Sequence, residues 1–568
     1  WLNLSEVLNG SDYGIYGKMY ELINTYDPKQ GRFLLDNTTE AQNRYLQQAE
    51  FRNTNWFKEL FSPAIMQNHS VSMSGGTSKS NYYASVSAMI DPGWYKQSNV
   101  NRYTANLNVS HNILSNLSIN VIAGAAYRKQ RAPGTLGQDV DVVGGEVKRD
   151  FDINPYSYAT NTSRVLDPRT YYRANYAPFN IFNELENNYI DLGVQDAKFQ
   201  VELKYKPIQG LELAVLGAFK HTTTSQQHNI KDNSNQAMAY RAMQNSIIRD
   251  ANKYLYRDPD NPNSLPMSIL PNGGILHKTE NTLSDYDFRV TANYNRTFDH
   301  KHVINLFGGM ETVDIQRNRS SYEGWGMQYY AGETPFYPYQ YFKKQVEEGN
   351  NYYGLTNTNW RTAAFYTNAT YAYKGRYVFN GTYRYEGSNQ LGRNSSARWM
   401  STWNVSGAWN VHEESFFERL RPLSHLTTRL SYSLTGTPPD PSYSSSTTIL
   451  KSYTPFRLFA EDQEPGIGIE QLGNADLTYE KKNELNAGFD AGLFGDRLSL
   501  SFDAYTRRNF DEMGPMITQG IGGTIIRPAN VAEMMSSGLE LSITSQNIKT
   551  KDFNWTTSFI YSYTHSEI

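Results

Sequence analysis

Hydrophobic and polar residues alternate strictly through residues 482–507. The first arm places apolar side chains on one face, and a second alternating arm follows a turn at 494–497 that contains glycine and aspartate. Alternation with a period of two on both sides of such a turn predicts a β-hairpin. Each arm has roughly the ten residues that a tilted transmembrane strand needs. This hairpin is the unit that most of the chain repeats.

The same alternation predicts about sixteen strands in all. The expected strands are 69–76, 82–89, 103–110, 117–127, 199–205, 211–219, 286–294, 303–311, 363–373, 377–385, 400–410, 426–434, 484–493, 498–505, 537–546 and 553–563. Short turns are expected at 77–79, 112–116, 207–210, 299–302, 374–375, 494–497 and 547–552. Residues 412–424 resemble a turn of helix between two strands, and the remaining connections are long.

Strict alternation of short and long connections is typical of a transmembrane β-barrel, whose periplasmic turns are short and whose extracellular loops are long. One face of the predicted strands carries Leu, Val, Phe, Tyr and Ala, which suits lipid, and the other carries Ser, Thr, Asn, Gly and charge, which suits a lumen. In the hairpin at 482–507, Leu485, Phe489, Leu500 and Phe502 are expected to face lipid, and Asp490 and Asp503 the lumen or a plug. The chain is therefore predicted to be all-β, a transmembrane antiparallel β-barrel.

Residues 1–66 lack the strand pattern and contain two stretches that predict short helices in an irregular segment. If the short turns are periplasmic, the first predicted strand runs downward and an upward strand must precede it. Residues 1–66 are then expected to form the first extracellular connection and residues 67–568 the barrel. The last predicted strand would run upward, so at least one strand is expected to be missing at each end. The chain begins at Trp1 without a signal peptide.

Composition narrows the classes of protein. The net charge of −3 gives no electrostatic case for nucleic acid, and the absence of cysteine excludes a disulfide scaffold or a thiolate metal site. No run of about 18 apolar residues is present, which excludes a helical membrane protein. The 43 tyrosines suit a surface where one end of the side chain is apolar and the other wet. Composition alone leaves a soluble, tyrosine-rich β protein open.

Several segments spread along the chain carry a family resemblance. They are WFKELF followed by HSVSMSGGTSKSNYYASVS, TYRYEGSNQLG (382–392), AWNVHEESFFERL (408–420), RLSYSLTGTPP (429–439) and LGNADLTYEKKNELNAGFDAGLFGDRLSLSFDAYTR (472–507). Together they resemble the SusC/RagA-type TonB-dependent outer-membrane transporters. The segment 530–543 keeps the family's Gly-x-Glu, but Ala532 and Ser536 replace its usual Gly and Asn, and Thr402 and Trp403 replace a common Phe-Pro.

The resemblance implies a barrel of about 22 strands with an N-terminal plug, of which about sixteen strands are present here. It also implies energy from TonB, acting through a region upstream of Trp1, and a SusD-like surface lipoprotein as an extracellular lid. A dimer of transporter–lid pairs is compatible with it. The implied location is the outer membrane of a Gram-negative bacterium, in contact with its lipid.

No arrangement of residues in the sequence predicts catalysis, and the chain is not expected to be an enzyme. His300 and His302 flank Lys301 in a predicted turn, where metal binding is disfavoured. Asp258, Asp260, Asn261 and Asn263 form an oxygen-rich stretch that could suit calcium, but its spacing is not that of an EF-hand and a solvated turn is favoured. No metal or cofactor is therefore predicted. Glu413 and Glu414 match a family turn motif, and the GIGG at 520–523 lacks the setting of a phosphate loop.

One predicted extracellular loop, residues 320–342, is unusually aromatic. It carries Trp325, Tyr329, Tyr330, Phe336, Tyr337, Tyr339 and Tyr341, and Trp94 in another loop is a weaker candidate of the same kind. Aromatic faces suit stacking on sugars, packing on peptide side chains, or contact with a lid protein. The alternative is a loop that packs on itself and on the barrel wall.

The function expected from these features is active import of oligosaccharides or oligopeptides, with a lid that captures substrate and TonB-driven movement of the plug that releases it. A passive porin of about sixteen strands is the first alternative. A soluble or surface β protein, such as a carbohydrate-binding module, is the second. The sequence does not distinguish a glycan from a peptide substrate.

Overall fold

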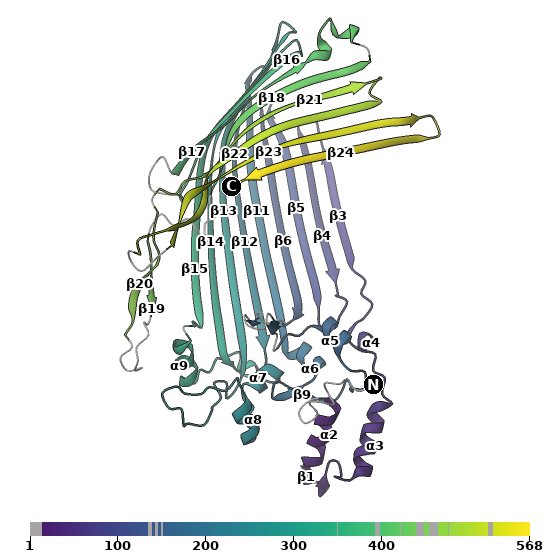
Figure 1. The fold of residues 1–568 in the computed structure, drawn as a ribbon, viewed down its shortest axis with the longest axis vertical. Coiled ribbons are helices and arrows are strands. Elements are labelled where there is room, and N and C mark those ends of the chain that lie inside the picture. The colour runs from purple at the N-terminus through teal and green to yellow at the C-terminus, as the bar shows by residue number, and fades with distance from the viewer. Residues whose placement is uncertain are drawn as a thin grey trace.

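The computed structural model describes residues 14–134, 139–141, 146–148, 151–348, 350–391, 398–420, 422–438, 448–453, 464–474, 476–520 and 526–568. Sixteen strands form one sheet in which every neighbouring pair is antiparallel. The sheet follows chain order from β3 to β24, interrupted only by short strand pairs inside the long connections. It is curved, so that β22, β23 and β24 pass across β11 to β14 (Figure 1). Within the described residues β3 and β24 are its two edges.

The predicted number and order of strands are confirmed. The strands of the large sheet are β3 (Gln67–Gly76), β4 (Ser80–Asp91), β5 (Asn99–Leu114), β6 (Leu117–Pro133), β11 (Asn188–Ile208), β12 (Leu211–Ile230), β13 (Gly274–Phe298), β14 (His302–Met327), β15 (Tyr353–Tyr373), β16 (Tyr377–Ser388), β17 (Trp399–Asn410), β18 (Leu423–Thr437), β21 (Glu480–Leu493), β22 (Leu498–Ile517), β23 (Ile526–Lys549) and β24 (Asn554–Glu567).

Helices and short strand pairs occupy the connections. The helices are α2 (Gly14–Asn24), α3 (Thr39–Glu50), α4 (Trp56–Leu60), α5 (Pro155–Asn161), α6 (Ile181–Asn187), α7 (Asn235–Ala239), α8 (Ser246–Ala251) and α9 (Tyr339–Glu347), with 3-10 turns η1 (Tyr329–Ala331), η2 (Val411–Glu413) and η3 (Phe417–Arg419). The short strands are β1 (Tyr26–Asp27), β2 (Arg32–Phe33), β7 (Asp139–Asp141), β8 (Glu146–Lys148), β9 (Tyr172–Ala174), β10 (Ala177–Phe179), β19 (Ile449–Tyr453) and β20 (Gly466–Gln471). The helical turn expected at 412–424 is thus two 3-10 turns. No helix in the described part of the chain is long and apolar enough to cross a bilayer.

Many strands extend beyond their predicted ends on the side of the long connections. Strand β13 has 25 residues and β14 has 26, whereas the alternation predicted about nine in each. Residues 320–327, expected to begin a loop, are therefore the end of β14. In part of these extensions, as at residues 277–282 of β13, both faces are polar, so no hydrophobic periodicity marks them.

The register of the strands separates two faces, as the sequence predicts. On β13 the apolar face carries Tyr286 and Phe288, whose side chains are about half exposed, while Arg289 lies on the polar face directly opposite Glu311 of β14. In the hairpin β21–β22 the rings of Phe489 and Phe502 pair at 5.7 Å on the apolar face. We use the terms apolar face and polar face for these two sides. In a transmembrane barrel the former meets lipid and the latter lines the lumen.

The predicted short turns are confirmed, and their backbone explains their residues. In the β13–β14 turn Asp299 and His300 both have a φ of +52°, and in the β15–β16 turn Lys374 and Gly375 have φ values of +53° and +69°. Two successive residues with positive φ are the signature of a turn that matches the twist of paired strands. Asp and Gly accept this conformation at low cost.

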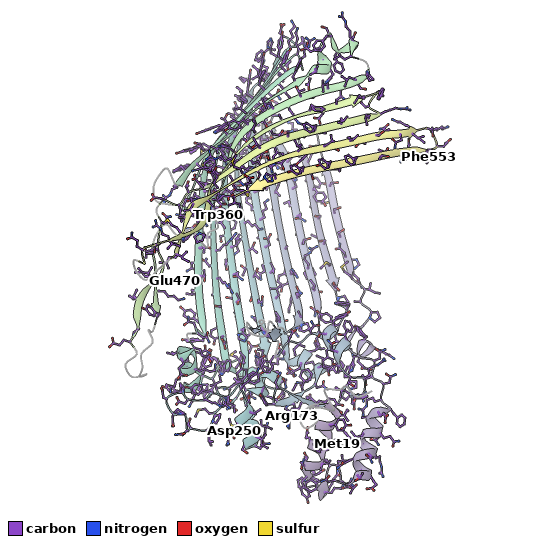
Figure 2. The ribbon with its side chains drawn as sticks, in the orientation of Figure 1. Met19, Arg173, Asp250, Trp360, Glu470 and Phe553 are labelled. Atoms are coloured by element: carbon purple, nitrogen blue, oxygen red, sulfur yellow. The ribbon has the colours of Figure 1, made fainter. Side chains whose placement is uncertain are left out.

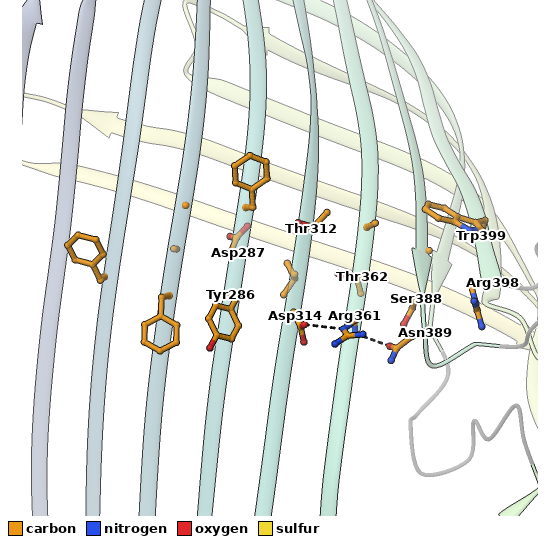
Figure 3. A pocket seen from close by; sticks show the side chains of 18 residues that line it. Tyr286, Asp287, Thr312, Asp314, Arg361, Thr362, Ser388, Asn389, Arg398 and Trp399 are labelled. Carbon is orange, nitrogen blue, oxygen red and sulfur yellow. Dashed lines mark hydrogen bonds and ion pairs between the residues drawn. The ribbon is translucent and has the colours of Figure 1, made fainter.

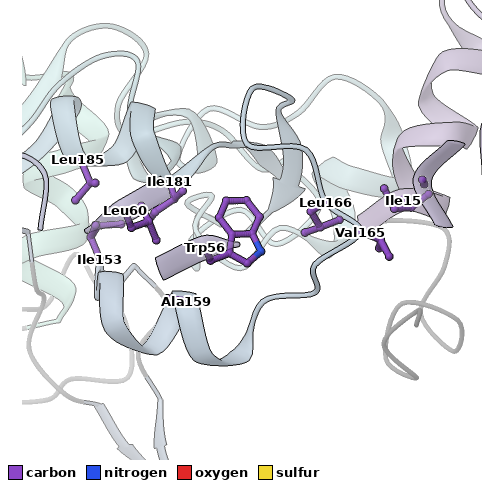
Figure 4. Close-up of a cluster of buried hydrophobic side chains, with 10 residues drawn as sticks. Ile15, Trp56, Leu60, Ile153, Ala159, Val165, Leu166, Ile181 and Leu185 are labelled. Atoms are coloured by element: carbon purple, nitrogen blue, oxygen red, sulfur yellow. The ribbon is translucent and has the colours of Figure 1, made fainter. Parts of the chain in front are cut away.

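The N-terminal segment 14–61 and the connections 151–187, 231–273 and 328–352 lie together at one end of the strands, and we call them the loop layer (Figure 1). Met19, Arg173 and Asp250 lie in this layer, far from Phe553 at the β23–β24 turn (Figure 2). A buried hydrophobic cluster joins α2 and α4 to the connection between β6 and β11, with Trp56 at its centre (Figure 4). The Trp56 indole donates to the carbonyl of Ser163 at 3.0 Å. The loop layer therefore has a core of its own.

Candidate functional site

A second hydrophobic cluster lies where β12, β13 and β14 meet the loop layer. Its buried members, which we call the roof cluster, are Ile230, Ala237, Tyr256, Ile269, Leu270, Ile275, Trp325 and Tyr341. Trp325 lies two residues before the end of β14, directly opposite Ile275, and its indole donates to the Ile269 carbonyl at 2.5 Å. The Tyr341 ring from α9 stacks on the Trp325 ring with centroids 4.9 Å apart. The cluster thus fixes two connections, 231–273 and 328–352, to the strand ends.

The eight aromatic residues singled out from the sequence divide into two groups. Trp325 and Tyr341 are buried, and Tyr329 and Tyr337 are partly buried against the same strand ends. The Tyr329 hydroxyl donates to the Ile275 carbonyl at 3.0 Å, and the Tyr337 hydroxyl donates to the Glu323 carbonyl at 2.8 Å. These four side chains have the self-packing role that the sequence left open as an alternative.

The other four aromatic side chains are exposed. They are Tyr330 at 79%, Tyr339 at 73%, Trp94 at 59% and Phe336 at 47% of their full accessible area. Trp94 lies apart from the others, against Phe61 with ring centroids 5.5 Å apart. Contact of these four residues with a ligand or a lid remains a prediction.

The oxygen-rich stretch near Asp258 holds a lysine. Lys343 of α9 places its Nζ 2.5 Å from carboxylate oxygens of both Asp258 and Asp260, and Glu347 accepts from the Tyr256 hydroxyl at 2.9 Å. These hydrogen bonds raise the pKa of Lys343 and lower that of Asp258. Asp258, Asp260 and Glu347 form the one carboxylate group of metal-binding geometry among the described residues. The ammonium already supplies the positive charge there, so we interpret the group as a tether between 231–273 and α9.

The two histidines of the β13–β14 turn do not come together. His300 sits in the turn itself, and His302 shares a hydrogen bond of 2.7 Å between its Nδ1 and the hydroxyl of Tyr371 on β15. His302 is partly buried and Tyr371 exposed at the short-turn end of the sheet. This placement suits an interfacial ring of aromatic side chains rather than a metal site.

A buried polar contact inside the loop layer has no motif in the sequence that predicts it. Glu184 of α6 is 1% exposed, and its Oε1 accepts from the backbone N–H of Asn235 at 2.9 Å. The Asn235 amide in turn donates to the carbonyls of Ala174 and Pro178 at 2.8 and 3.0 Å. The other Glu184 oxygen is buried without a hydrogen-bond partner. The pair joins connection 151–187 to connection 231–273 across 51 residues of sequence.

We expect this contact to weaken as the pH rises. Burial raises the pKa of Glu184 from 4.5 to about 7. Between these values the folded state therefore holds the Glu184 proton more tightly than the unfolded state. The contribution of Glu184 to stability is fully present below pH 4.5 and is lost as the pH rises through about 7. Hydrogen exchange at Asn235, corrected for its intrinsic pH dependence, should speed up across this window. In Glu184→Gln, whose side chain stays neutral, this increase in the exchange rate with pH should disappear. An increase that persists would contradict the attribution to Glu184.

Ion pairs line the polar face in the middle of the sheet. Glu311 of β14 lies 3.2 Å from Arg289 and 2.7 Å from Arg384, and Arg384 also pairs with Glu386 at 2.6 Å. In the hairpin β21–β22, Asp490 and Asp503 both pair with Arg429 of β18. The prediction that these carboxylates lie on the other face from Phe489 and Phe502 is confirmed. This part of the wall is polar and close to neutral because its charges pair among themselves.

A groove of about 710 Å³ lies on the wall where Tyr286, Asp314 and Arg361 are in register across β13, β14 and β15 (Figure 3). Arg361 pairs with Asp314 at 3.0 Å, and its backbone N–H donates to Asn389 at 2.8 Å. These residues follow the row of Phe288 on the apolar face. At this row the run of apolar side chains on the apolar face ends, and the strands continue past it toward the loop layer.

Comparison with known proteins gives a consistent result. A family model described as TonB dependent receptor-like, beta-barrel matches residues 138–568. TonB-dependent receptor P3 of Formosa agariphila is 24% identical over 541 residues, which cover 90% of this chain and 46% of that protein. TonB-dependent receptor SusC of Bacteroides thetaiotaomicron is 23% identical over 540 residues, which cover 91% of this chain and 48% of that protein.

Among solved structures, the RagAB peptide transporter superposes with a TM-score of 0.64 at 20% identity, covering 94% of this chain and 54% of that one. The RagAB peptide importer in its open-open state gives 0.65 at the same identity and coverage. Likeness at this identity shows the fold. The chain spans about half the length of the curated relatives it matches.

Proposed function

The chain belongs to the TonB-dependent receptor-like β-barrel family, and on that premise we propose that it forms the barrel of an importer driven by TonB. Proteins of this family lie in the outer membrane of Gram-negative bacteria, which is the membrane that the apolar face meets. The proposed cargo is an oligosaccharide or an oligopeptide. The proposed partner is a SusD-like surface lipoprotein that closes the extracellular end.

This proposal rests on the contrast between the regular antiparallel sheet and the folded loop layer at one end of its strands. The wall consists of antiparallel strands with an apolar face and a polar face, and its turns are short. The long connections of β6, β12 and β14 fold into one loop layer with its own hydrophobic clusters. A passive pore needs an open lumen, whereas a layer held together by buried cores suits capture of a substrate before transport.

The full-length protein, expressed in its own bacterium, tests the proposal. We expect affinity purification from detergent-extracted outer membranes to recover a lipoprotein partner, and we expect uptake of the cargo to stop when TonB is deleted. A protein that purifies alone and passes small solutes at equal rates with and without TonB would be a porin. A protein that leaves the membrane without detergent would contradict membrane insertion.

The exposed aromatic side chains of connection 328–352 supply a sharper prediction. Exchange of both Tyr330 and Tyr339 for alanine should weaken binding of the lipoprotein partner or the cargo by roughly 2 kcal/mol or more, as central aromatic contacts do in interfaces. Isothermal titration with the purified full-length protein measures the loss. Tyr205→Ala removes a tyrosine that is 43% exposed near the β11–β12 turn, at the opposite end of the strands, and should leave the affinity unchanged. If the Tyr330, Tyr339 double variant binds as tightly as Tyr205→Ala, then Tyr330 and Tyr339 contact neither the partner nor the cargo.

A further inference from the structure

Six cationic side chains lie on the polar face below the loop layer. We call them the cationic band, and they are Arg102, Arg128, Lys198, Lys220, Arg317 and Arg319. The register places them in three successive cross-strand rows of β5, β6, β11, β12 and β14. Arg319 precedes Trp325 of the roof cluster by six residues on β14, or about 20 Å along the strand. The band therefore lies on the wall between the loop layer and the ion pairs around Glu311.

Like charges face each other within the band. Arg102 is directly opposite Arg128, and Lys198 is directly opposite Lys220. Directly opposed like charges destabilise a sheet, because their side chains share one face at close range. Elsewhere on this face Arg289 lies opposite Glu311 and Glu484 opposite Arg507. Where two carboxylates are opposed, at Asp503 and Glu540, Asp503 pairs with Arg429. The repulsion in the band is relieved if an anion binds between the cations.

Few carboxylates offset the band. Asp196 lies 3.5 Å from Lys220, and Asp285 is directly opposite Lys220 with one oxygen buried and without a hydrogen bond. Among the residues that the structure describes, no carboxylate lies within ion-pair distance of the other five cations. Arg102, Lys198, Arg317 and Arg319 are also exposed. Within its three rows the band therefore carries six positive charges against two negative ones, with Asp287 in the next row, on a solvent-accessible part of the wall.

The surroundings of the band are rich in hydroxyl and amide groups. Thr224, Asn281 and Thr356 lie in the row of Arg319, and Thr104, Thr222 and Thr358 lie in the row of Arg317. Hydroxyl and amide groups can donate to and accept from sugar hydroxyls, and the cations can pair with carboxylate or sulfate groups. We propose that the band binds an acidic oligosaccharide, and that this is the cargo class of the import proposed above, on which the inference rests.

Binding to the purified full-length transporter tests the inference with three probes: hexagalacturonate, neutral maltohexaose and the acidic peptide hexaglutamate. We expect hexagalacturonate to bind about tenfold tighter than maltohexaose at low salt, a difference of about 1.4 kcal/mol. High salt should remove most of this advantage, because exposed charges are screened. The double variant Arg317→Gln, Arg319→Gln should lose the advantage at low salt as well.

Lys129→Gln is the matched control. Lys129 lies on β6 beside Arg128, at the same height but on the apolar face opposite Gly193, and it is exposed. Its loss should leave the affinity for hexagalacturonate unchanged. Heat-modifiable gel mobility should show that every variant is folded. The inference is overturned if maltohexaose binds equally well, if hexaglutamate binds more tightly than hexagalacturonate, or if the double variant binds like the wild type.

Uptake by cells separates this inference from the proposed function. TonB-dependent uptake of maltohexaose without uptake of hexagalacturonate would leave the importer standing and overturn the acidic cargo. Salt-sensitive binding of hexagalacturonate that depends on Arg317 and Arg319, without any TonB-dependent uptake, would support the band and overturn the importer.

Discussion

Replacing Trp325 with alanine is expected to destabilise the loop layer by about 3–5 kcal/mol, the usual cost of removing a buried tryptophan. The indole is 4% exposed, stacks on Tyr341 and donates a hydrogen bond to the Ile269 carbonyl. Its loss leaves a cavity in the roof cluster and a carbonyl without its donor. Hydrogen exchange of connections 231–273 and 328–352 should accelerate strongly, and limited proteolysis should cut there first.

The middle of the wall should be unaffected by Trp325→Ala, because the roof cluster takes only Ile230, Ile275 and Trp325 from the wall, all near the ends of β12, β13 and β14. Tyr330→Ala serves as the control for this change. Tyr330 is five residues from Trp325 in sequence but 79% exposed, so its removal should leave the exchange rates unchanged. If both variants exchange like the wild type, the roof cluster does not hold the two connections. If the wall itself exchanges faster, the loop layer and the barrel unfold as one unit.

Gly326→Ala is expected to cost roughly 2–5 kcal/mol, the sum of backbone strain and steric overlap. Gly326 has a φ of +65°, which L side chains rarely adopt, and an added Cβ would overlap the carbonyl oxygen of Phe336. The Phe336 N–H donates to the Gly326 carbonyl at 3.1 Å, so the two segments cannot separate without losing this bond. Connection 328–352 should therefore detach locally from the end of β14, as read by exchange at Phe336.

Gly332→Ala serves to separate the backbone strain from the steric overlap. Gly332 has a φ of +77°, but a Cβ there would meet nothing within 4 Å. It should cost only the backbone strain, about 1–2 kcal/mol. Equal exchange rates at Phe336 in both variants would show that close packing around Gly326 contributes nothing.

The wall of the barrel was largely predictable because its signal is local. A strand with one face toward lipid and one toward a lumen must alternate, and each short turn needs residues such as Gly375 or Asp299 that accept positive φ. The alternation at 286–294 therefore located β13, and the pairing of Phe489 with Phe502 followed from the hairpin. The same signal failed farther along β13, where residues 277–282 are strand with polar side chains on both faces.

The loop layer was not predictable in the same way. The aromatic residues at 320–342 looked alike in sequence, yet Tyr341 is buried and Tyr339, two positions earlier, is 73% exposed. That difference depends on a helix packing against a strand that ends at Met327, and on the loop 231–273 that meets both. Glu184 and Asn235 carry no motif, and their contact exists only because two distant connections fold together.

The sequence by itself determined the family, the number and order of the strands, and which side chains face lipid, because a membrane imposes a period of two on every strand that crosses it. Only the tertiary structure decided which aromatic residues hold the loop layer together and which remain free to bind. It also placed Arg102 opposite Arg128 and Lys198 opposite Lys220, because cross-strand register is a property of paired strands rather than of either strand alone.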